Sequence, residues 1–277
     1  MSSVLFDAPG PKGVRRHRLI GIVTIAFLVA LAVVVAWKLQ REGQLAGDKW
    51  EPFVTPSIVE LLLKGLLNTL RAAALAIVLA VVLGVLLGVG KLSDHRIIRW
   101  PAWLFVEFFR AVPLLMLILF IWAVRGYRIE DLLPLVVGLT LYNGAVLAEV
   151  FRAGINAVPQ GQAEAAYAIG MRKSQVMRII QLPQAVKIML PSIVSQCIVA
   201  LKDTSLGFYI LAPGFTYAGR EVYRTFDNIL QTALVLAVVY IILNLLLSLL
   251  GAWLQRRFSS SSGGSVQIVA GQVLTKD

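Results

Sequence analysis

The sequence has little of the chemistry on which most enzymes and disulfide-rich proteins depend. Among its 277 residues there is one cysteine, Cys197, and there are two histidines, His17 and His95. One cysteine excludes a disulfide framework and a cysteine-ligated zinc site. Two histidines leave little for a histidine-based metal site or a Ser/His/Asp triad, and neither H-E-x-x-H nor G-x-S-x-G occurs. The sequence therefore gives no sign of an enzyme active site.

Charged residues are also scarce, and those present are mainly cations. They make up 15% of the chain, whereas about a quarter is usual for soluble domains. Hydrophobic residues make up 58%, the mean hydropathy is +0.79 and the formal net charge is +11. These values exclude an ordinary soluble enzyme and a disordered chain. They indicate an integral membrane protein with basic cytoplasmic edges.

A nucleotide-binding signature is missing as well. No G-x-x-x-x-G-K-[ST] occurs, and Lys173-Ser174 is not preceded by the glycine that a phosphate loop needs. We expect no cofactor on this chain and no nucleic-acid partner. Since no segment is long and polar enough for a separate soluble domain, any ATP-hydrolysing or external part must come from another chain.

Long apolar runs are what the sequence has in abundance. A bilayer core needs about 20 mainly apolar residues per helix. We therefore predict an all-α fold with six spans, at 19–37, 66–90, 102–124, 132–156, 191–213 and 227–254. Residues 58–65 are interpreted as an interfacial lead-in to the second span. Within that span, Gly84 and Gly88 form a small-x-x-x-small pair, which favours close helix packing.

The distribution of Lys and Arg predicts the orientation. With six spans both termini lie on one side, and the loops on that side carry 15 cations against 7 on the other. The positive-inside rule then places both termini and the 157–190 loop in the cytoplasm. The remaining four cations lie in or beside spans: Lys64, Arg71, Arg110 and Lys202.

The first span has a second interpretation. The basic residues 15–18 and the Ala30-Leu31-Ala32 segment resemble a signal peptide with a cleavage site. The uncharged run has 19 residues, longer than the usual 7–15 of such a signal, so we expect a retained anchor helix. Cleavage would leave five spans and an external N-terminus.

The interval 157–190 is too polar to span a membrane and too patterned for a linker. Pro159 suits a helix start, residues 162–169 favour helix and Gly170 suits its end. Ser174 is a candidate cap for a second helix, whose residues Val176, Ile179 and Ile180 form one apolar stripe, and Pro183 is expected to end it. The prediction is two short helices bent at a glycine.

The spacing in this loop resembles that of a known family. Glu164-Ala165-Ala166, three residues, Gly170, nine residues, Ile180, one residue and Leu182-Pro183 look like the EAA loop of ABC-importer permeases. The flanks resemble the polar amino-acid permeases among them, at 108–115 (FFRAVPLL), 148–155 (AEVFRAGI), 158–162 (VPQGQ) and 201–206 (LKDTSL). The resemblance covers roughly residues 60–255. The additional N-terminal span resembles glutamate permeases of actinobacteria.

This resemblance implies an assembly and a role for the loop. The family has a five-helix core, here 58–256, preceded by the extra region 1–57 and followed by a tail, 257–277. The loop docks as a coupling helix on a dimer of ATPase subunits, which bind ATP and Mg²⁺, and the pore contains a second permease chain. An external binding protein delivers the amino acid. The residues assigned to coupling are Gln162, Glu164, Ala165, Ala166, Gly170, Arg172, Lys173, Ile180, Leu182 and Pro183.

Charges within spans are costly and usually face a partner or a cavity. Arg110 follows Pro101 by nine residues and Lys202 follows Pro191 by eleven. At about 1.5 Å per residue this places both roughly 13–17 Å deep. Pro113 is expected to kink the third span beyond Arg110. The candidate substrate-binding residues are Arg110, Asn143, Lys202, Asp203 and Thr204.

The cations can clamp a carboxylate, and Asp203 and Thr204 can receive an α-amino group. A structural interpretation stays open, because Glu107 with Arg110 and Glu149 with Arg152 are i, i+3 pairs. Lys202 and Asp203 can likewise neutralise each other.

The function expected from this resemblance is ATP-driven import of a polar amino acid, most specifically L-glutamate. Glutamine, aspartate, arginine and histidine remain alternatives, because the matching motifs are common to the whole subfamily. A self-contained secondary transporter is a further alternative, although it would be expected to show internal repeats and more spans. By analogy with glutamate systems, we expect the second permease to be a similar but different chain.

Overall fold

The computed structural model describes residues 10–259, and this part of the chain is helical with no strand. The predicted tail from residue 260 onwards and the first nine residues lie outside it. The α-helices are α1 (Pro11–Arg41), α2 (Pro56–Lys91), α3 (Arg96–Ala111), α4 (Leu114–Val124), α5 (Leu133–Asn156), α6 (Gln160–Ala168), α7 (Lys173–Gln175), α8 (Leu182–Asp203), α9 (Phe215–Phe226) and α10 (Ile229–Ser259). Shorter elements are the 3₁₀ helices 47–49, 51–54 and 204–210 and a π-helix, Val176–Gln181.

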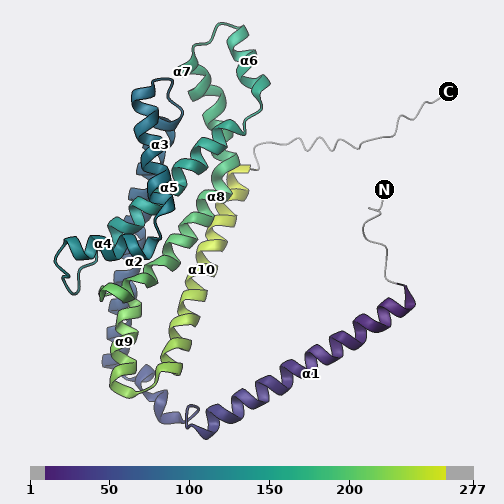
Figure 1. Cartoon of the computed structure of the whole chain (residues 1–277), viewed down its shortest axis with the longest axis vertical. Helices are drawn as coiled ribbons and strands as arrows, with labels where there is room; N and C mark the ends of the chain where they lie inside the picture. The colour runs from purple at the N-terminus through teal and green to yellow at the C-terminus, as the bar shows by residue number, and fades with distance from the viewer. Residues whose placement is uncertain (1–9, 260–277) are drawn as a thin grey trace.

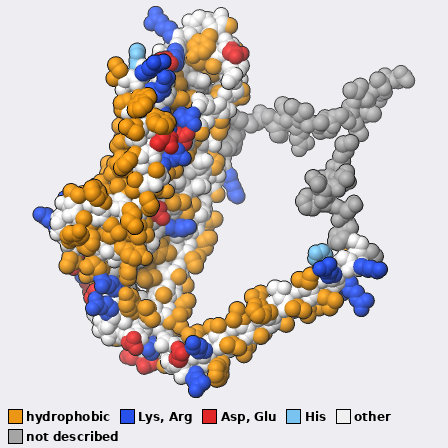
Figure 2. Space-filling model, in the orientation of Figure 1, with side chains coloured by type: hydrophobic (Ala, Val, Ile, Leu, Met, Phe, Trp, Pro, Cys, Tyr) orange, Lys and Arg blue, Asp and Glu red, His pale blue; other side chains and the backbone are white. Residues whose placement is uncertain are grey.

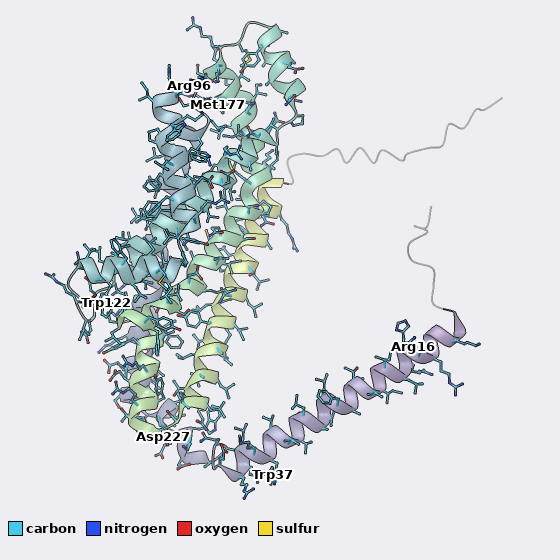
Figure 3. All side chains as sticks on the ribbon, viewed as in Figure 1. Arg16, Trp37, Arg96, Trp122, Met177 and Asp227 are labelled. Atoms are coloured by element: carbon cyan, nitrogen blue, oxygen red, sulfur yellow. The ribbon has the colours of Figure 1, made fainter. Side chains whose placement is uncertain are left out.

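The long helices run along the molecule between two ends (Figure 1). We call one the α6 end, where α6 and α7 lie, and the other the α9 end, where α9 and the connection 42–55 lie. Arg96 and Met177 mark the α6 end and Asp227 the α9 end in Figure 3. Five helices of the described chain are long and apolar enough to cross a membrane, or six if α3 and α4 count as one bent span. The prediction of an all-α membrane fold is confirmed.

Close packing of α2 against α5 forms the centre of the molecule. A Cβ on Gly84 would lie 2.8 Å from the Cβ of Leu147, and one on Gly88 would lie 3.1 Å from the carbonyl oxygen of Ala148. Only glycine allows the two backbones to approach this closely. Residues 58–65, interpreted as an interfacial lead-in, are the first turns of α2 itself.

The third predicted span is not one straight helix. α3 ends at Ala111 and α4 begins at Leu114, with a bend of 101° between them. Pro113 is the residue before α4, where its missing N–H and fixed φ suit a helix start and cannot continue α3. The predicted kink is therefore a complete break, and α4 lies across the other helices (Figure 1).

The fifth predicted span also has different limits. A helical stretch runs from Lys173 to Ile210, so Pro183 does not end the second loop helix and Pro191 lies inside α8. Pro183 is tolerated because it occupies the first turn of α8, where its missing N–H costs little. The wide π-turns before it leave room that a regular α-helix would not. The prediction of two short helices in this loop is wrong for the second one.

The connection before α10 contains a helix that the sequence pattern did not reveal. Residues 214–226 were expected to be a short loop, but α9 packs its apolar face, Phe215, Ala218 and Val222, against Leu62 of α2. The α9 end is tied together further by Asn228, whose side chain donates to the carbonyl oxygen of Lys49 at 3.0 Å. The apolar residues of α9 recur with the 3.6-residue period of a helix, but Arg220 and Arg224 interrupt the apolar run, so the segment was not predicted to be a helix.

The additional N-terminal helix, α1, stands apart from the other helices (Figure 1). None of its most hydrophobic 18-residue window is buried in the chain. Figure 2 shows hydrophobic side chains along its length and Lys and Arg gathered at its N-terminal end. An apolar helix without protein contacts along its sides is typical of a segment surrounded by lipid.

Candidate functional site

The first candidate site is the segment 157–181 at the α6 end. α6 begins after Pro159 and stops at Gly170, which has φ +81°. The N–H of Gly170 donates to the Tyr167 carbonyl at 2.9 Å and that of Met171 donates to the Ala166 carbonyl at 3.2 Å. These two bonds form a Schellman motif, for which a left-handed glycine is the usual requirement. The predicted first helix and its glycine stop are confirmed.

The second half of this segment departs from the predicted pattern. The helix is capped by Arg172, whose N–H donates to Oε1 of Gln175 at 2.8 Å, and not by Ser174. Val176 is buried but Ile179 is 61% exposed, so the expected apolar stripe is broken. The physical reason is the π-helix, whose wider turn rotates Ile179 away from the face of Val176.

Most of the residues assigned to coupling are presented at the surface of the α6 end. Only Ala166 is buried and Ile180 is half-buried, while the others are exposed: Gln162, Glu164, Ala165, Gly170, Arg172, Lys173, Leu182 and Pro183. A polar pocket of about 360 Å³ lies at the foot of α6 and is lined by Asn156, Gln160, Glu164 and Gln181, among others. This surface can receive another protein without rearrangement of a core.

An ion pair joins the segment to the α2–α3 connection. Nζ of Lys173 donates to a carboxylate oxygen of Asp94. The hydrogen bond and charge of Lys173 lower the pKa of the Asp94 carboxyl below its ordinary value. The two parts of the α6 end are thereby linked across 79 residues of sequence.

The second candidate site is a cluster of five charged side chains, which we call the Lys91 cluster. Nζ of Lys91 lies 2.7 Å from Glu149 and 3.2 Å from Glu107. Arg110 pairs with Glu107 at 3.5 Å, and Arg152 pairs with Glu149. The cluster joins the last residue of α2 to α3 and α5, and the Lys91 side chain is only 6% exposed.

This cluster answers one question left open by the sequence. Both i, i+3 pairs are present, so Arg110 is engaged with Glu107. Lys91 was counted only as a loop cation, because its role depends on three helices meeting and no local pattern reveals it. Asn143 is likewise engaged within the protein: it is buried, donates to the Leu139 carbonyl and accepts from Gln196 at 2.6 Å.

Lys202 belongs to a third site, a cavity of about 560 Å³ between α8 and α10. Its other polar lining residues are Ser205, Tyr240, Asn244 and Ser248. Within residues 10–259 no ion pair joins Lys202 to Asp203, the half-buried last residue of α8. Thr204 is buried and its hydroxyl donates to the Leu201 carbonyl at 2.6 Å. The five substrate candidates are therefore distributed over separate places.

The polar residues of α10 in this cavity were missed by the sequence analysis. Tyr240, Asn244 and Ser248 recur every four residues, which places them on one face of the helix. That period was visible in the sequence and pointed to a polar face inside an apolar span. Among the described residues no group of three His, Cys, Asp or Glu side chains is arranged to hold a metal ion.

Comparison with known proteins places the chain in a family. Residues 52–260 match the family described as binding-protein-dependent transport system inner membrane component, and the chain belongs to this family. It is 38% identical to the glutamate transport system permease protein GluD of Corynebacterium glutamicum, over 79% of this chain and 83% of that protein. It is 31% identical to the glutamate/aspartate import permease protein GltK of Escherichia coli, over 74% and 96% respectively.

Solved structures agree with this placement. A crystal structure of an amino acid ABC transporter with histidines matches with a TM-score of 0.68 and 30% identity, over 72% of this chain and 94% of that chain. The MetNI methionine ABC transporter, at 22% identity and a TM-score of 0.64, shows the same fold. The chain is thus a permease subunit of an amino-acid ABC importer in the membrane. It is not itself an enzyme, and the ATPase of such a system is a separate subunit.

Proposed function

We propose that this chain carries L-glutamate across the bacterial cytoplasmic membrane as one of two permease subunits. Two of its relatives are named for glutamate or for glutamate and aspartate, which supports an acidic substrate. Another relative, from Bacillus subtilis and 29% identical, is named as an arginine transport system permease protein, so the family alone does not select the substrate.

The observation that carries the proposal of ATPase coupling is the exposure of α6. A short helix with a fixed end at Gly170 and one buried residue, Ala166, presents nearly all its surface to a partner. α6 follows α5 directly and is followed by the helical stretch that leads into α8. A rigid-body displacement of α6 by two closing ATPase subunits, which bind ATP and Mg²⁺, would thus move two spans together. This is the basis of alternating access here.

The proposed orientation follows from the same assignment. The α6 end lies in the cytoplasm, where the ATPases are, and the α9 end faces the external binding protein. Both chain termini are then cytoplasmic, in agreement with the excess of Lys and Arg in the loops on that side. The second permease is proposed to be a similar but different chain.

Lys202 is the residue that we propose to contact the substrate carboxylate. It is exposed in the chain, it lies in a polar cavity between two spans and it has no carboxylate partner among the ion pairs of residues 10–259. The neighbouring Asp203 carboxylate is within electrostatic reach but forms no ion pair with Lys202 among the described residues, so the ammonium group is left available to an anionic ligand. Arg110 and Asn143 are more weakly supported, since both are engaged with protein groups.

The test is ATP-driven uptake by the complete transporter in proteoliposomes, with Lys202→Met compared with Lys64→Met. Lys64 lies in α2, is exposed and pairs with Glu60. Loss of one charge-assisted contact, about 1.5–3 kcal/mol, would raise the KM for glutamate about tenfold to a hundredfold in Lys202→Met only. An unchanged KM removes Lys202 from the substrate site. Preference for glutamine over glutamate in the wild-type protein contradicts the acidic substrate itself.

A further inference from the structure

A cavity of about 610 Å³ opens beside the Lys91 cluster and has no part in the proposed function. It is lined by Lys91, Arg99, Trp100, Trp103, Glu107, Glu149 and Arg152. Lys91 ends α2, Arg99 lies in the first turn of α3 and Arg152 lies near the end of α5. The cavity therefore lies where three helices reach the α6 end, which the proposed orientation places at the cytoplasmic boundary of the membrane.

The charges around this cavity are not balanced within the chain. Three cations, Lys91, Arg110 and Arg152, share the carboxylates of Glu107 and Glu149. Arg99 adds a fourth cation on the cavity wall. Asp94, the further carboxylate within electrostatic reach of Arg99, is already paired with Lys173. The cavity lining itself has three cations against two carboxylates, and Arg110 beside it adds a further positive charge, so an anion would be stabilised here.

Two tryptophans make the other part of the lining. The rings of Trp100 and Trp103 lie 6.1 Å apart, and these residues are 64% and 47% exposed. Tryptophan collects at the membrane–water interface, where its ring lies among lipid headgroups and its N–H meets water. A site for a free aqueous anion does not need exposed tryptophans, whereas a lipid with an anionic headgroup matches both the cations and the tryptophans that line the cavity.

We propose that this cavity binds the headgroup of an anionic phospholipid, with the phosphate toward Arg99 and the glycerol and upper acyl chain along Trp100 and Trp103. With the α6 end in the cytoplasm, as proposed above, the lipid belongs to the cytoplasmic leaflet. A basic pocket between spans on that side is a recurrent type of lipid site. The lipid would hold α3 against α2 and α5 at the point where the Lys91 cluster joins them.

The experiment measures lipid binding, which makes it independent of uptake and substrate. The complete transporter, stripped of lipid in a neutral detergent, is titrated with phosphatidylglycerol or with phosphatidylcholine, and native mass spectrometry follows the first lipid bound. Arg99→Gln is compared with Arg96→Gln, because Arg96 is also exposed on the first turn of α3 but does not line the cavity. Both changes remove one surface charge and neither disturbs a buried contact.

The site predicts tighter binding of phosphatidylglycerol than of phosphatidylcholine. Arg99→Gln should weaken the first phosphatidylglycerol about fivefold, since one cation at a membrane surface contributes about 1 kcal/mol, and Arg96→Gln should not. Equal effects of the two variants, or no preference for phosphatidylglycerol, would overturn the proposal.

Two further arms test other occupants. Displacement of phosphatidylglycerol by inorganic phosphate at a similar concentration would assign the cavity to a free anion and overturn the lipid assignment. On a Cys197→Ala background, efficient disulfide formation between Trp103→Cys and a cysteine on the second permease would show that protein covers this face, which also overturns it. A lipid-covered cavity should show neither displacement by inorganic phosphate nor efficient disulfide formation.

Discussion

Glycine has opposite roles in the α6 segment and in the α2–α5 pair. Gly170, after α6, is in the left-handed region at φ +81° with open space around its Cβ position, so its backbone conformation matters and its size does not. Gly84, in α2, has a helical backbone, but a Cβ there would meet Leu147 at 2.8 Å. The α6 segment needs glycine for its backbone conformation, and the α2–α5 pair needs glycine for close packing between the two helices.

Substitutions in the two regions should therefore affect different properties, namely stability in the α2–α5 pair and transport in the α6 segment. α6 has a single buried residue, Ala166, and contributes little apolar burial, whereas α5 has thirteen buried residues. Changes in the α2–α5 pair should therefore first lower the melting temperature of the transporter. Changes in the α6 segment should lower uptake while the melting temperature stays the same.

The largest effect on stability is expected from Lys91→Met. This change removes the buried cation that joins Glu107 and Glu149. Breaking a buried ion pair costs about 3–5 kcal/mol, and the loss here should lie at the lower end, because these carboxylates are 41% and 25% exposed and keep Arg110 and Arg152. The melting temperature of the purified transporter should fall by many degrees. Lys64→Met, which removes an exposed pair with Glu60, should cost about 0–1 kcal/mol. Equal shifts for the two variants would mean that the Lys91 cluster is not a structural joint.

A smaller loss of stability is expected from Gly84→Ala. The added Cβ must push α2 away from Leu147 and Phe151, and overpacking of this kind costs about 1–3 kcal/mol. Gly161→Ala is the matched control, because its Cβ would meet nothing within 4 Å and alanine favours helix. Thermal unfolding should therefore move in opposite directions for the two variants. A stable Gly84→Ala protein would show that the helices do not pack this closely.

Gly170→Ala should lower uptake more than it lowers the melting temperature, which is the opposite of the result expected for Gly84→Ala. A left-handed backbone would cost a non-glycine residue about 1–2 kcal/mol, but the exposed turn has open space around it and can change its backbone conformation to avoid most of this cost. The melting temperature should change little, while ATP-driven uptake falls severalfold because the end of α6 shifts relative to the ATPase. Gly161→Ala again serves as the control, with uptake near that of the wild type. If uptake by Gly170→Ala equals that of Gly161→Ala, the turn has no role in coupling.

The smallest effect is expected from acid at the Asp94–Lys173 pair. Lys173 lowers the folded pKa of Asp94 below its unfolded value of about 3.9, so the pair is intact at neutral pH. Its contribution is lost only as the pH falls through that lower folded value. Spin labels on cysteines at His95 and Gln175, with Cys197→Ala, would report a wider distance distribution in acid. The Asp94→Asn variant should show the wider distance distribution at every pH. A narrow distribution that does not change with pH in either protein would contradict the proposed link between Asp94 and Lys173.

Helix α6 and its glycine stop could be predicted from sequence, whereas the second half of the 157–181 segment and the sites between helices could not. Proline, alanines and glycine act locally, so the start of α6 and its stop at Gly170 follow from residues near one another in the chain. The i, i+3 pairs of Glu107 with Arg110 and of Glu149 with Arg152 are equally local.

Features that depend on tertiary packing were missed. Lys91 joins its partners only after α2, α3 and α5 have met. The helical stretch continues past Pro183, which lies in the first turn of α8, and α8 contains Pro191, although the rule that proline ends a helix anticipates neither. The Lys202 cavity needs α10 beside α8.

The central claim is that the exposed face of α6 docks on the ATPase. Single cysteines at Gln162, Ala165 and Ala166, on a Cys197→Ala background, can be treated with a short bifunctional thiol reagent in the complete transporter. Gln162 and Ala165 are exposed and Ala166 is 4% exposed. We predict cross-links to the ATPase from Gln162→Cys and Ala165→Cys, with loss of uptake, and none from Ala166→Cys. A transporter that remains active and whose α6 cysteines never reach the ATPase would contradict the claim.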